Sequence, residues 1–224
     1  MPSPNPTWKP GDKIESPVNE MVLFDSTTLD QPQMYKLLIG AVIPRPIAFV
    51  STQSSAGVGN LSPFSFFMGI SSKPPCIAIS ITRKSDGSKK DTLANIEETG
   101  EFVVNSANEW LAEPLVYSSG QFPYGVDEMQ KVGLTPLPSV KIKPPRVMES
   151  AVQMECRLYN SIEIGDGSQG SSVLVIGEIL AMHIAKQAFK DGKILHSELK
   201  PIARLGGFGY AKIGETFELT PPKV

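Results

Sequence analysis

The sequence predicts a mainly β protein in which short antiparallel strands are joined by Gly- and Pro-rich turns. The clearest evidence is a strand pair at residues 149–164 and 171–189. In the first run Val152, Met154 and Cys156 alternate with polar residues, and the second run is rich in β-branched residues. Similar runs elsewhere raise the expected count to about six or seven strands, enough for a closed or nearly closed sheet.

The segment between these two strands, Gly165 to Gly170, spells G-x-G-x-x-G. A dinucleotide-binding fingerprint of this kind follows a strand and opens a helix, whereas here a second strand follows. We therefore expect the glycines to serve a hairpin turn.

The first hairpin is expected within residues 44–70, where two apolar runs flank the turn 54–60. Successive side chains of a strand point to opposite faces. One face of the first strand carries Ala48, Val50 and Thr52, and the other carries Ile47, Phe49 and Ser51. After the turn, small polar residues interleave with aromatic ones. This mixture fits either core aromatics or a surface that holds a flat, partly polar ring, and the residues alone leave both open.

An anion site is expected further along. A strand at 76–82 leads into the basic loop 83–90, and residues 91–100 fit a short helix with Asp91 or Thr92 as N-cap and a glycine at its end. Free N–H groups at a helix start, a threonine hydroxyl and nearby cations suit a phosphate monoester. The alternative, which the residues alone favour, is a charged surface loop before an ordinary capped helix.

The rest of the chain supplies an arm, short helices and connections. Residues 1–20 are rich in proline and are expected to form an extended arm, with the folded domain at 21–224. Short helices are expected at 28–40 and within 107–131, and an irregular connection at 136–146. A further strand is expected at 101–106, and residues 216–220 are expected to form an edge strand or a piece of a subunit interface.

Composition argues against several classes of protein. The net charge of −2 gives no support for a nucleic-acid partner or a membrane surface, and no run is apolar for long enough to span a bilayer. The two cysteines, Cys76 and Cys156, lie in apolar strands, which favours buried thiols over a disulfide framework. The N-terminus lacks a signal peptide's hydrophobic region, so a soluble, cytoplasmic protein is expected.

Two histidines, His183 and His196, are present without the clustered ligands of a metal site, so no metal is expected. His183 fits either a hydrogen-bonded structural histidine or a ligand contact. Near the C-terminus, residues 201–211 are dense in glycine, which permits close backbone approach to a ring system or a second subunit. A mobile surface loop is the alternative.

Three segments carry the most specific pattern in the chain: RPIAFVST at 45–52, NLSPFSFF at 60–67 and KDTLANI at 90–96. In this order and spacing they resemble the flavin reductase-like, FMN-binding split-barrel family. The similarity extends from about residue 35 to residue 212. The resemblance implies an antiparallel Greek-key split β-barrel with short helical insertions, a bound FMN cofactor, and a homodimer with FMN near the interface.

The resemblance also implies roles for individual residues. Arg83, Lys90 and Thr92 are expected to hold the FMN phosphate. The expected cofactor-binding set is Arg45, Ser51, Thr52, Asn60, Ser62, Pro63, Phe64, Ser65, Ser80, Arg83, Lys90, Asp91, Thr92, His183 and Tyr210. His196 and Arg204 are the catalytic candidates, and Arg204 with Tyr210 is expected to position an anionic nicotinamide donor or to complete the flavin pocket.

Three functions are compatible with the resemblance. The first is an NAD(P)H-dependent FMN oxidoreductase that uses a small-molecule donor and passes electrons to free flavin, a ferric chelate or a partner monooxygenase. The second is a flavoredoxin-like electron carrier reduced by a protein partner, and the third is a non-catalytic FMN-binding protein. Hydride transfer to flavin needs no protein nucleophile, so the lack of a catalytic triad does not count against an enzyme.

Overall fold

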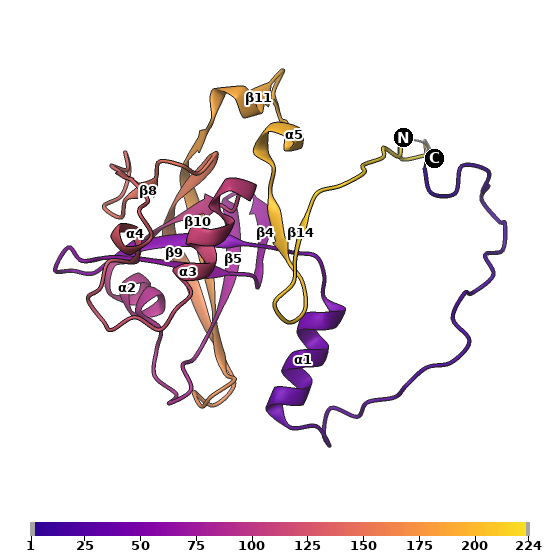
Figure 1. The fold of residues 1–224 in the computed structure, drawn as a ribbon, viewed down its shortest axis with the longest axis horizontal. Coiled ribbons are helices and arrows are strands. Elements are labelled where there is room, and N and C mark those ends of the chain that lie inside the picture. The colour runs from indigo at the N-terminus through magenta and orange to yellow at the C-terminus, as the bar shows by residue number, and fades with distance from the viewer. Residues whose placement is uncertain (1–2, 223–224) are drawn as a thin grey trace.

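The structure, a computed structural model, describes residues 3–222 and is built around one large antiparallel sheet (Figure 1). Its seven strands are ordered β3-β2-β6-β9-β10-β5-β4. They are β2 (Ala48–Gln53), β3 (Gly59–Phe64), β4 (Phe67–Ser72), β5 (Pro75–Thr82), β6 (Glu101–Ser106), β9 (Val152–Ile164) and β10 (Ser172–Ile184). Every neighbouring pair is antiparallel, as predicted.

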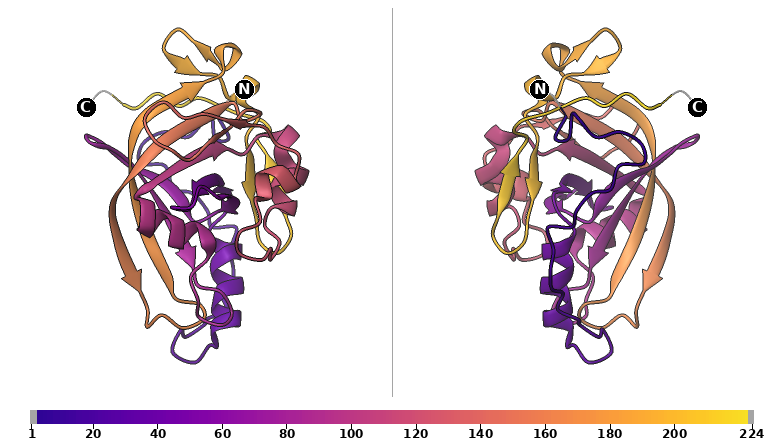
Figure 2. Two further views of the ribbon diagram at one scale, coloured as in Figure 1. Left: turned by 90° about the vertical axis from the view of Figure 1, so that its left-hand side faces the viewer. Right: turned by 90° about the vertical axis from the view of Figure 1, so that its right-hand side faces the viewer.

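The sheet curls into a barrel that is split between its two edge strands (Figure 2). These edges, β3 and β4, are consecutive in sequence and are separated only by Ser65 and Phe66. The Ser80 amide donates a 2.8 Å hydrogen bond to the Phe66 carbonyl, which ties this corner to β5. From β5 the chain passes over two strands to reach β6. The predicted antiparallel Greek-key split barrel with short helical insertions is confirmed.

Strand β4 is an element that the sequence does not predict. The strand at 76–82 is expected directly after the first hairpin, but Phe67–Ser72 lies between them and pairs with β5. Apart from Phe67, every residue of β4 is exposed, including Met68 and Ile70. Because β4 is an edge strand with no buried face, it shows no alternation of apolar and polar residues.

Two apolar clusters lie on opposite faces of β2. Ala48 and Val50 belong to the inner cluster, which fills the barrel, whereas Ile47 and Phe49 belong to the outer cluster. The predicted alternation along this strand is therefore confirmed. The helix α2 (Asp91–Thr99) contributes to the inner cluster. The outer cluster is covered by η1 (Glu109–Leu111), α3 (Ala112–Tyr117) and α4 (Glu128–Lys131).

The predicted helix at 91–100 is confirmed, but its predicted N-cap is wrong. Lys90 occupies the cap position with an extended backbone and makes no side-chain cap hydrogen bond. Neither Asp91 nor Thr92 caps the helix, because the first pairs with Lys84 and the second accepts from Asn60. The helix ends at a left-handed glycine, Gly100 (φ 72°), as predicted.

The β9–β10 hairpin confirms the interpretation of the G-x-G-x-x-G segment. Gly165, Gly167 and Gly170 all have positive φ, at 98°, 85° and 92°, and form the turn between the strands. The strand pair expected at 149–164 and 171–189 is present as β9 and β10, but β10 ends at Ile184, and four short elements follow it. These are η2 (Lys186–Ala188), β11 (Phe189–Lys190), β12 (Lys193–Ile194) and α5 (His196–Leu199).

The remaining short elements connect the sheet to the helices. The run 136–146 is irregular except at its two ends, where the short strands β7 (Pro136–Leu137) and β8 (Arg146–Val147) pair with each other. Cys76 and Cys156 are buried and free, as predicted. Within residues 3–222, no helix has the length and apolar composition needed to cross a bilayer. Over the same range, no three His, Cys, Asp or Glu side chains gather to hold a metal ion.

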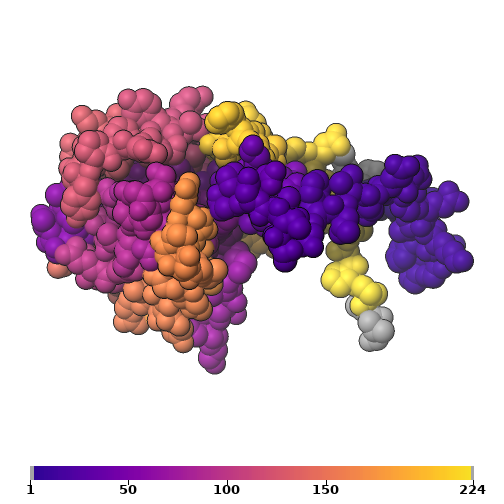
Figure 3. All heavy atoms as spheres, turned by 90° about the horizontal axis from the view of Figure 1, so that it is seen from below, coloured from indigo at the N-terminus to yellow at the C-terminus, as the bar shows by residue number. Residues whose placement is uncertain are grey.

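Helix α1 (Gln31–Ala41) stands beside the barrel, next to a small sheet of β1 (Arg45–Pro46), β13 (Ile202–Arg204) and β14 (Tyr210–Lys212). Asp30 caps this helix reciprocally with Gln33, and the helix predicted at 28–40 is confirmed. Residues 3–30 and 213–222 contain no helix or strand and extend away from the barrel (Figures 1 and 3). The edge strand expected at 216–220 is therefore wrong, because this segment has no neighbouring strand to pair with in the described chain, while the interface alternative stays a prediction.

Candidate functional site

The candidate site lies between the start of α2 and the inner side of β3. Asn60, Ser62 and Phe64 alternate along β3 with residues of the opposite face, so these three side chains share one face. The ammonium of Lys90 lies 5.6 Å from the centroid of the Phe64 ring, within cation–π range. The N-terminus of α2 and the polar side of β3 thus form one surface.

Lys90 is the main electrostatic feature of this surface. Within residues 3–222 its ammonium makes no hydrogen bond and no ion pair, whereas the neighbouring Lys84 and Lys89 each pair with a carboxylate. Burial lowers the pKa of Lys90, and the nearby Lys84 cation lowers it further. A partly buried cation without an anion is a destabilised charge, and a bound anion would relieve it.

A buried network of polar side chains lies next to Lys90. Asn60 Nδ2 donates to Thr52 Oγ1 at 3.1 Å and to Thr92 Oγ1 at 2.9 Å, and Asn95 Nδ2 donates to Thr52 Oγ1 at 3.0 Å. The Thr92 oxygen accepts from Asn60, and its own O–H has no acceptor in the described part of the chain. A hydroxyl has one hydrogen to give, so Thr92 remains available as a donor.

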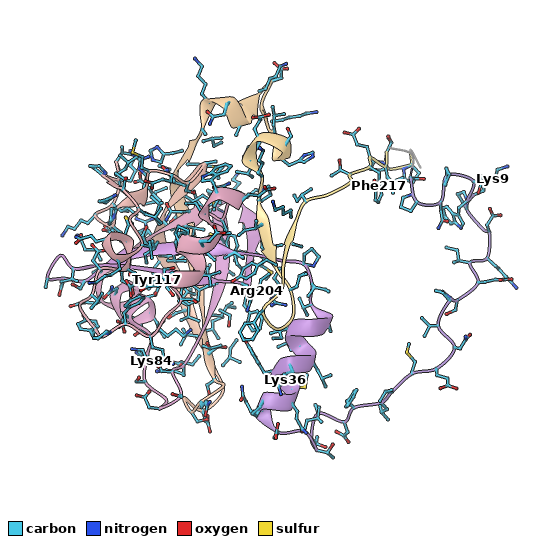
Figure 4. The ribbon with its side chains drawn as sticks, in the orientation of Figure 1. Lys9, Lys36, Lys84, Tyr117, Arg204 and Phe217 are labelled. Carbon is cyan, nitrogen blue, oxygen red and sulfur yellow. The ribbon has the colours of Figure 1, made fainter. Side chains whose placement is uncertain are left out.

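Cations of the preceding loop complete the site. Lys84 Nζ pairs with Asp91 Oδ1 at 2.8 Å, which compensates the acidic residue in the first turn of α2. Figure 4 shows Lys84 on the loop that precedes this helix. Arg83 pairs with Glu163 through Nη2 at 2.7 Å, while its buried Nε has no partner among residues 3–222. A second cationic side chain therefore keeps an unused donor.

This arrangement is suited to binding a phosphate monoester. The first N–H groups of α2 lack intrahelical partners, and the helix dipole is positive at that end. The uncompensated Lys90 ammonium and the free Thr92 hydroxyl lie at the same end. The unused groups are cations and hydrogen-bond donors, which is the complement of a phosphate.

Arg45 is an expected cofactor ligand that the structure places in the scaffold. It is 4% exposed, and its guanidinium donates to the carbonyls of Ile39, Val42 and Leu205. Its Nε also donates to Ser65 Oγ at 3.3 Å. Arg45 thereby joins the end of α1 to the β13–β14 loop. The bond to Ser65 is its side chain's one hydrogen bond to another residue of the expected cofactor-binding set among residues 3–222.

Ser51 and His183 are also engaged away from the start of α2. Ser51 lies on the outer face of β2 and donates to the Pro145 carbonyl. His183 Nε2 lies 2.7 Å from the buried carboxylate of Glu155, so its placement fits the structural alternative. Burial acts to raise the pKa of Glu155, but hydrogen bonds from the Val140 amide and His183 outweigh it and leave the pKa below its ordinary value.

Pro63 and Ser80 lie on the outward side of their strands. Ser80 stands between Ile79 and Ile81, which both belong to the inner cluster, so its side chain faces outward. Pro63 precedes Phe64, another inner residue, and faces the other way. The members of the expected set that share the inner surface are Thr52, Asn60, Ser62, Phe64, Lys90 and Thr92.

The two catalytic candidates lie elsewhere. The Arg204 guanidinium stacks 4.5 Å from the centroid of the Tyr210 ring and donates to the Gly207 and Gly209 carbonyls of the β13–β14 loop (Figure 4). His196 is an exposed residue at the start of α5, at the β11 end of the barrel and away from α2 (Figure 1). The described chain does not bring either residue to the α2 surface.

Two residues of the site were not identified from the sequence. Asn95 lies one helical turn after Thr92 and is 2% exposed, and its Oδ1 has no partner among the described residues. Its spacing of three from Thr92 was a usable signal, because such residues are neighbours on a helix. Lys84 compensates Asp91, and nothing in the basic loop's sequence distinguishes it from Lys89 or Lys90.

A family comparison agrees with this geometry. Residues 39–200 match the family model described as the flavin reductase like domain. The chain belongs to the flavin reductase like family. The matched range holds all seven strands of the barrel and the whole candidate site.

Relatives of this flavin reductase-like chain cover most of its length. An uncharacterized protein of Halalkalibacterium halodurans is 43% identical over 198 residues, covering 88% of this chain and 95% of the relative. The crystal structure of nitrilotriacetate monooxygenase component B from Bacillus cereus is 38% identical with a TM-score of 0.87, covering 90% of this chain and 100% of that one. Pseudomonas fluorescens 2-nitrobenzoate 2-nitroreductase is 32% identical with a TM-score of 0.81, and the match covers 90% of this chain and 96% of that one.

Proposed function

We propose that this protein is an FMN-binding oxidoreductase that draws electrons from NADH or NADPH. One observation carries the proposal: a partly buried, uncompensated Lys90 lies beside a free Thr92 hydroxyl at the N-terminus of α2. Family membership makes a flavin the expected ligand, and a phosphate-binding site of this kind selects FMN over riboflavin.

The residues present fit FMN. Lys90 and Thr92 would hold the phosphate, with the unused Nε of Arg83 as a further donor. Asn60 is fixed by Thr52 and Thr92, so the face of β3 that carries Ser62 and Phe64 is held in register with the start of α2. FMN supplies the redox chemistry when bound, by accepting a hydride from the nicotinamide and passing electrons on. The chain's own task is to bind the cofactor, orient it and exclude water.

The acceptor is proposed to be free flavin, a ferric chelate or a partner monooxygenase. Two similar proteins are named as a monooxygenase component and a nitroreductase, and both of these are redox proteins. In the described chain, the α2 surface offers donors and cations but no nucleophile paired with a base. Such a surface supports electron transfer through a bound cofactor without covalent catalysis by the protein.

We also propose a homodimer. No residue of α1 is buried, and Met34, Tyr35 and Leu38 are 38%, 46% and 40% exposed. The arm adds an apolar run at residues 21–24, which projects from the barrel with the rest of the N-terminal segment (Figure 3). A second copy of the chain would cover these apolar groups, which a monomer leaves in water.

The test is to reconstitute the purified full chain with FMN, remove excess flavin, and add NADH or NADPH anaerobically. We expect the protein to retain about one FMN per chain, the visible flavin absorption to bleach with one of the two donors, and light scattering to give the mass of two chains. Retained FMN without bleaching would favour the electron-carrier alternative. Bleaching by neither donor, nor by a protein reductant, would favour the non-catalytic one, and a colourless protein would refute all three.

A further inference from the structure

Strand β3 is an edge strand, and its outer backbone edge is held by an acidic residue from another element. Asn60 and Ser62 direct their backbone groups toward β2, so those of Leu61 and Pro63 point away from the sheet. Pro63 has no N–H, which leaves the Leu61 amide as the outward donor in the middle of the strand. The amide donates a 3.0 Å hydrogen bond to Glu128 Oε2 on α4.

The environment of Glu128 is unusual for a glutamate. Glu128 is only 6% exposed, and within residues 3–222 its carboxylate has no cationic partner. Burial raises the pKa of Glu128, and the carboxylates of Asp91 and Asp127 raise it further, against the lowering effect of the Leu61 amide. Burying an acid near other carboxylates lowers the stability of the fold, so stability alone does not explain the contact between Glu128 and Leu61.

Two further contacts fix α4 against the same strand. The Leu61 side chain is fully buried in the outer cluster, which includes Met129 of α4. A Cβ atom added to Gly59 would lie 2.9 Å from Asp127 Oδ2, so the start of β3 packs directly on the N-cap of α4. α4 therefore contacts β3 at three points: the Leu61 amide, the Leu61 side chain and Gly59.

The opposite face of the held strand carries the candidate cofactor site. Asn60 and Ser62 are the chain neighbours of Leu61, and Asn60 donates to Thr92 at the start of α2. A shift of the Leu61 backbone would move Asn60, and with it the alignment of β3 with Lys90 and Thr92. Among residues 3–222 no partner strand restrains this edge, because β3 is hydrogen-bonded there to β2 alone.

We propose that Glu128 is a positioning residue for the flavin site, and that it acts by holding the Leu61 amide so that Asn60 and Ser62 stay aligned with the start of α2. This inference rests on the proposed function for the identity of the ligand. It assigns a role to the 107–131 excursion, which otherwise only covers the outer cluster.

The test compares FMN affinity in three variants of the full chain by fluorescence titration. Glu128→Met keeps the length of the side chain and removes the acceptor, and we expect FMN to bind about tenfold more weakly. Glu128→Gln keeps an acceptor oxygen for Leu61 and is expected to bind FMN within about twofold of the unaltered chain. The matched control is Glu149→Ala, which removes a carboxylate that accepts from the Thr135 amide, beyond the end of α4, and not from β3.

Hydrogen exchange at the Leu61 amide supplies a second readout that does not depend on FMN. It should accelerate in Glu128→Met and stay slow in Glu128→Gln. Unchanged FMN affinity in Glu128→Met, or an equal loss in Glu149→Ala, would overturn the positioning role while leaving the proposed function intact. If the unaltered chain bound no FMN, the proposed function itself would fail. If Glu128→Met does not fold, Glu128→Gln decides the matter alone. FMN binding about tenfold weaker in Glu128→Gln would then refute the role of residue 128 as an acceptor for the Leu61 amide.

Discussion

Replacing Lys90 with Met and Thr92 with Val in one chain is expected to weaken FMN binding by about a thousandfold, as measured by fluorescence titration of the apoprotein. The methionine keeps a long apolar side chain over Phe64 and removes the uncompensated cation. The valine matches the shape of threonine and removes both the free O–H and the oxygen that accepts from Asn60. A hydrogen bond to a charged group contributes about 1.5 to 3 kcal/mol, so two such losses amount to about 4 kcal/mol.

Lys89→Met is the matched control for this variant. Lys89 is the neighbouring lysine of the same loop, but its ammonium pairs with Glu97 and its side chain is 41% exposed. Its removal should leave FMN affinity within about twofold, because an exposed ion pair contributes little. A role of Lys90 and Thr92 in binding the phosphate would be contradicted if their double variant bound FMN as tightly as the unaltered chain, or if Lys89→Met lost as much affinity.

Replacing Arg45 with Met is expected to lower the free energy of unfolding by about 3 kcal/mol, as measured by urea denaturation of the apoprotein. The guanidinium donates to the Ile39, Val42 and Leu205 carbonyls, and the residue is 4% exposed. Methionine fills much of the same space but donates nothing, so these carbonyls lose a shared partner. Hydrogen exchange should also accelerate at the C-terminal end of α1.

Arg157→Met provides the comparison for the Arg45 variant. Arg157 forms an ion pair with Glu178, and its side chain is 61% exposed. Its removal should change the free energy of unfolding by less than about 1 kcal/mol. Equal stability of Arg45→Met and the unaltered chain would show that the guanidinium does not hold α1 to the β13–β14 loop.

Local sequence patterns were sufficient for most of the fold. Alternation places Ala48 and Phe49 on opposite faces of β2, and Gly100 marks the end of α2 through its left-handed backbone. Strand β4 was missed because an exposed edge strand has no buried face to mark it. The N-cap of α2 was misassigned because Asp91 is held by Lys84, a contact that cap preferences do not reveal.

The candidate site was predictable only in part. The alternation of side chains along a strand predicts which face each one lies on, but not which residue it contacts. Thr52, Asn60 and Thr92 were identified through motifs, and the structure brings them together by direct hydrogen bonds. Arg45 belongs to the same motifs, yet one of its acceptors, Leu205, lies 160 residues away in sequence. Its role depends on tertiary packing that no local pattern encodes.

The central claim is that the start of α2 binds the phosphate of a flavin, and calorimetric titration of the full-length apoprotein with FMN and with riboflavin tests it most directly. The two ligands share the ring and the ribityl chain and differ by the phosphate. We expect FMN to bind at one site per chain and riboflavin to bind more weakly by at least about a hundredfold. Equal affinity for the two ligands, or no binding of FMN, would contradict the claim.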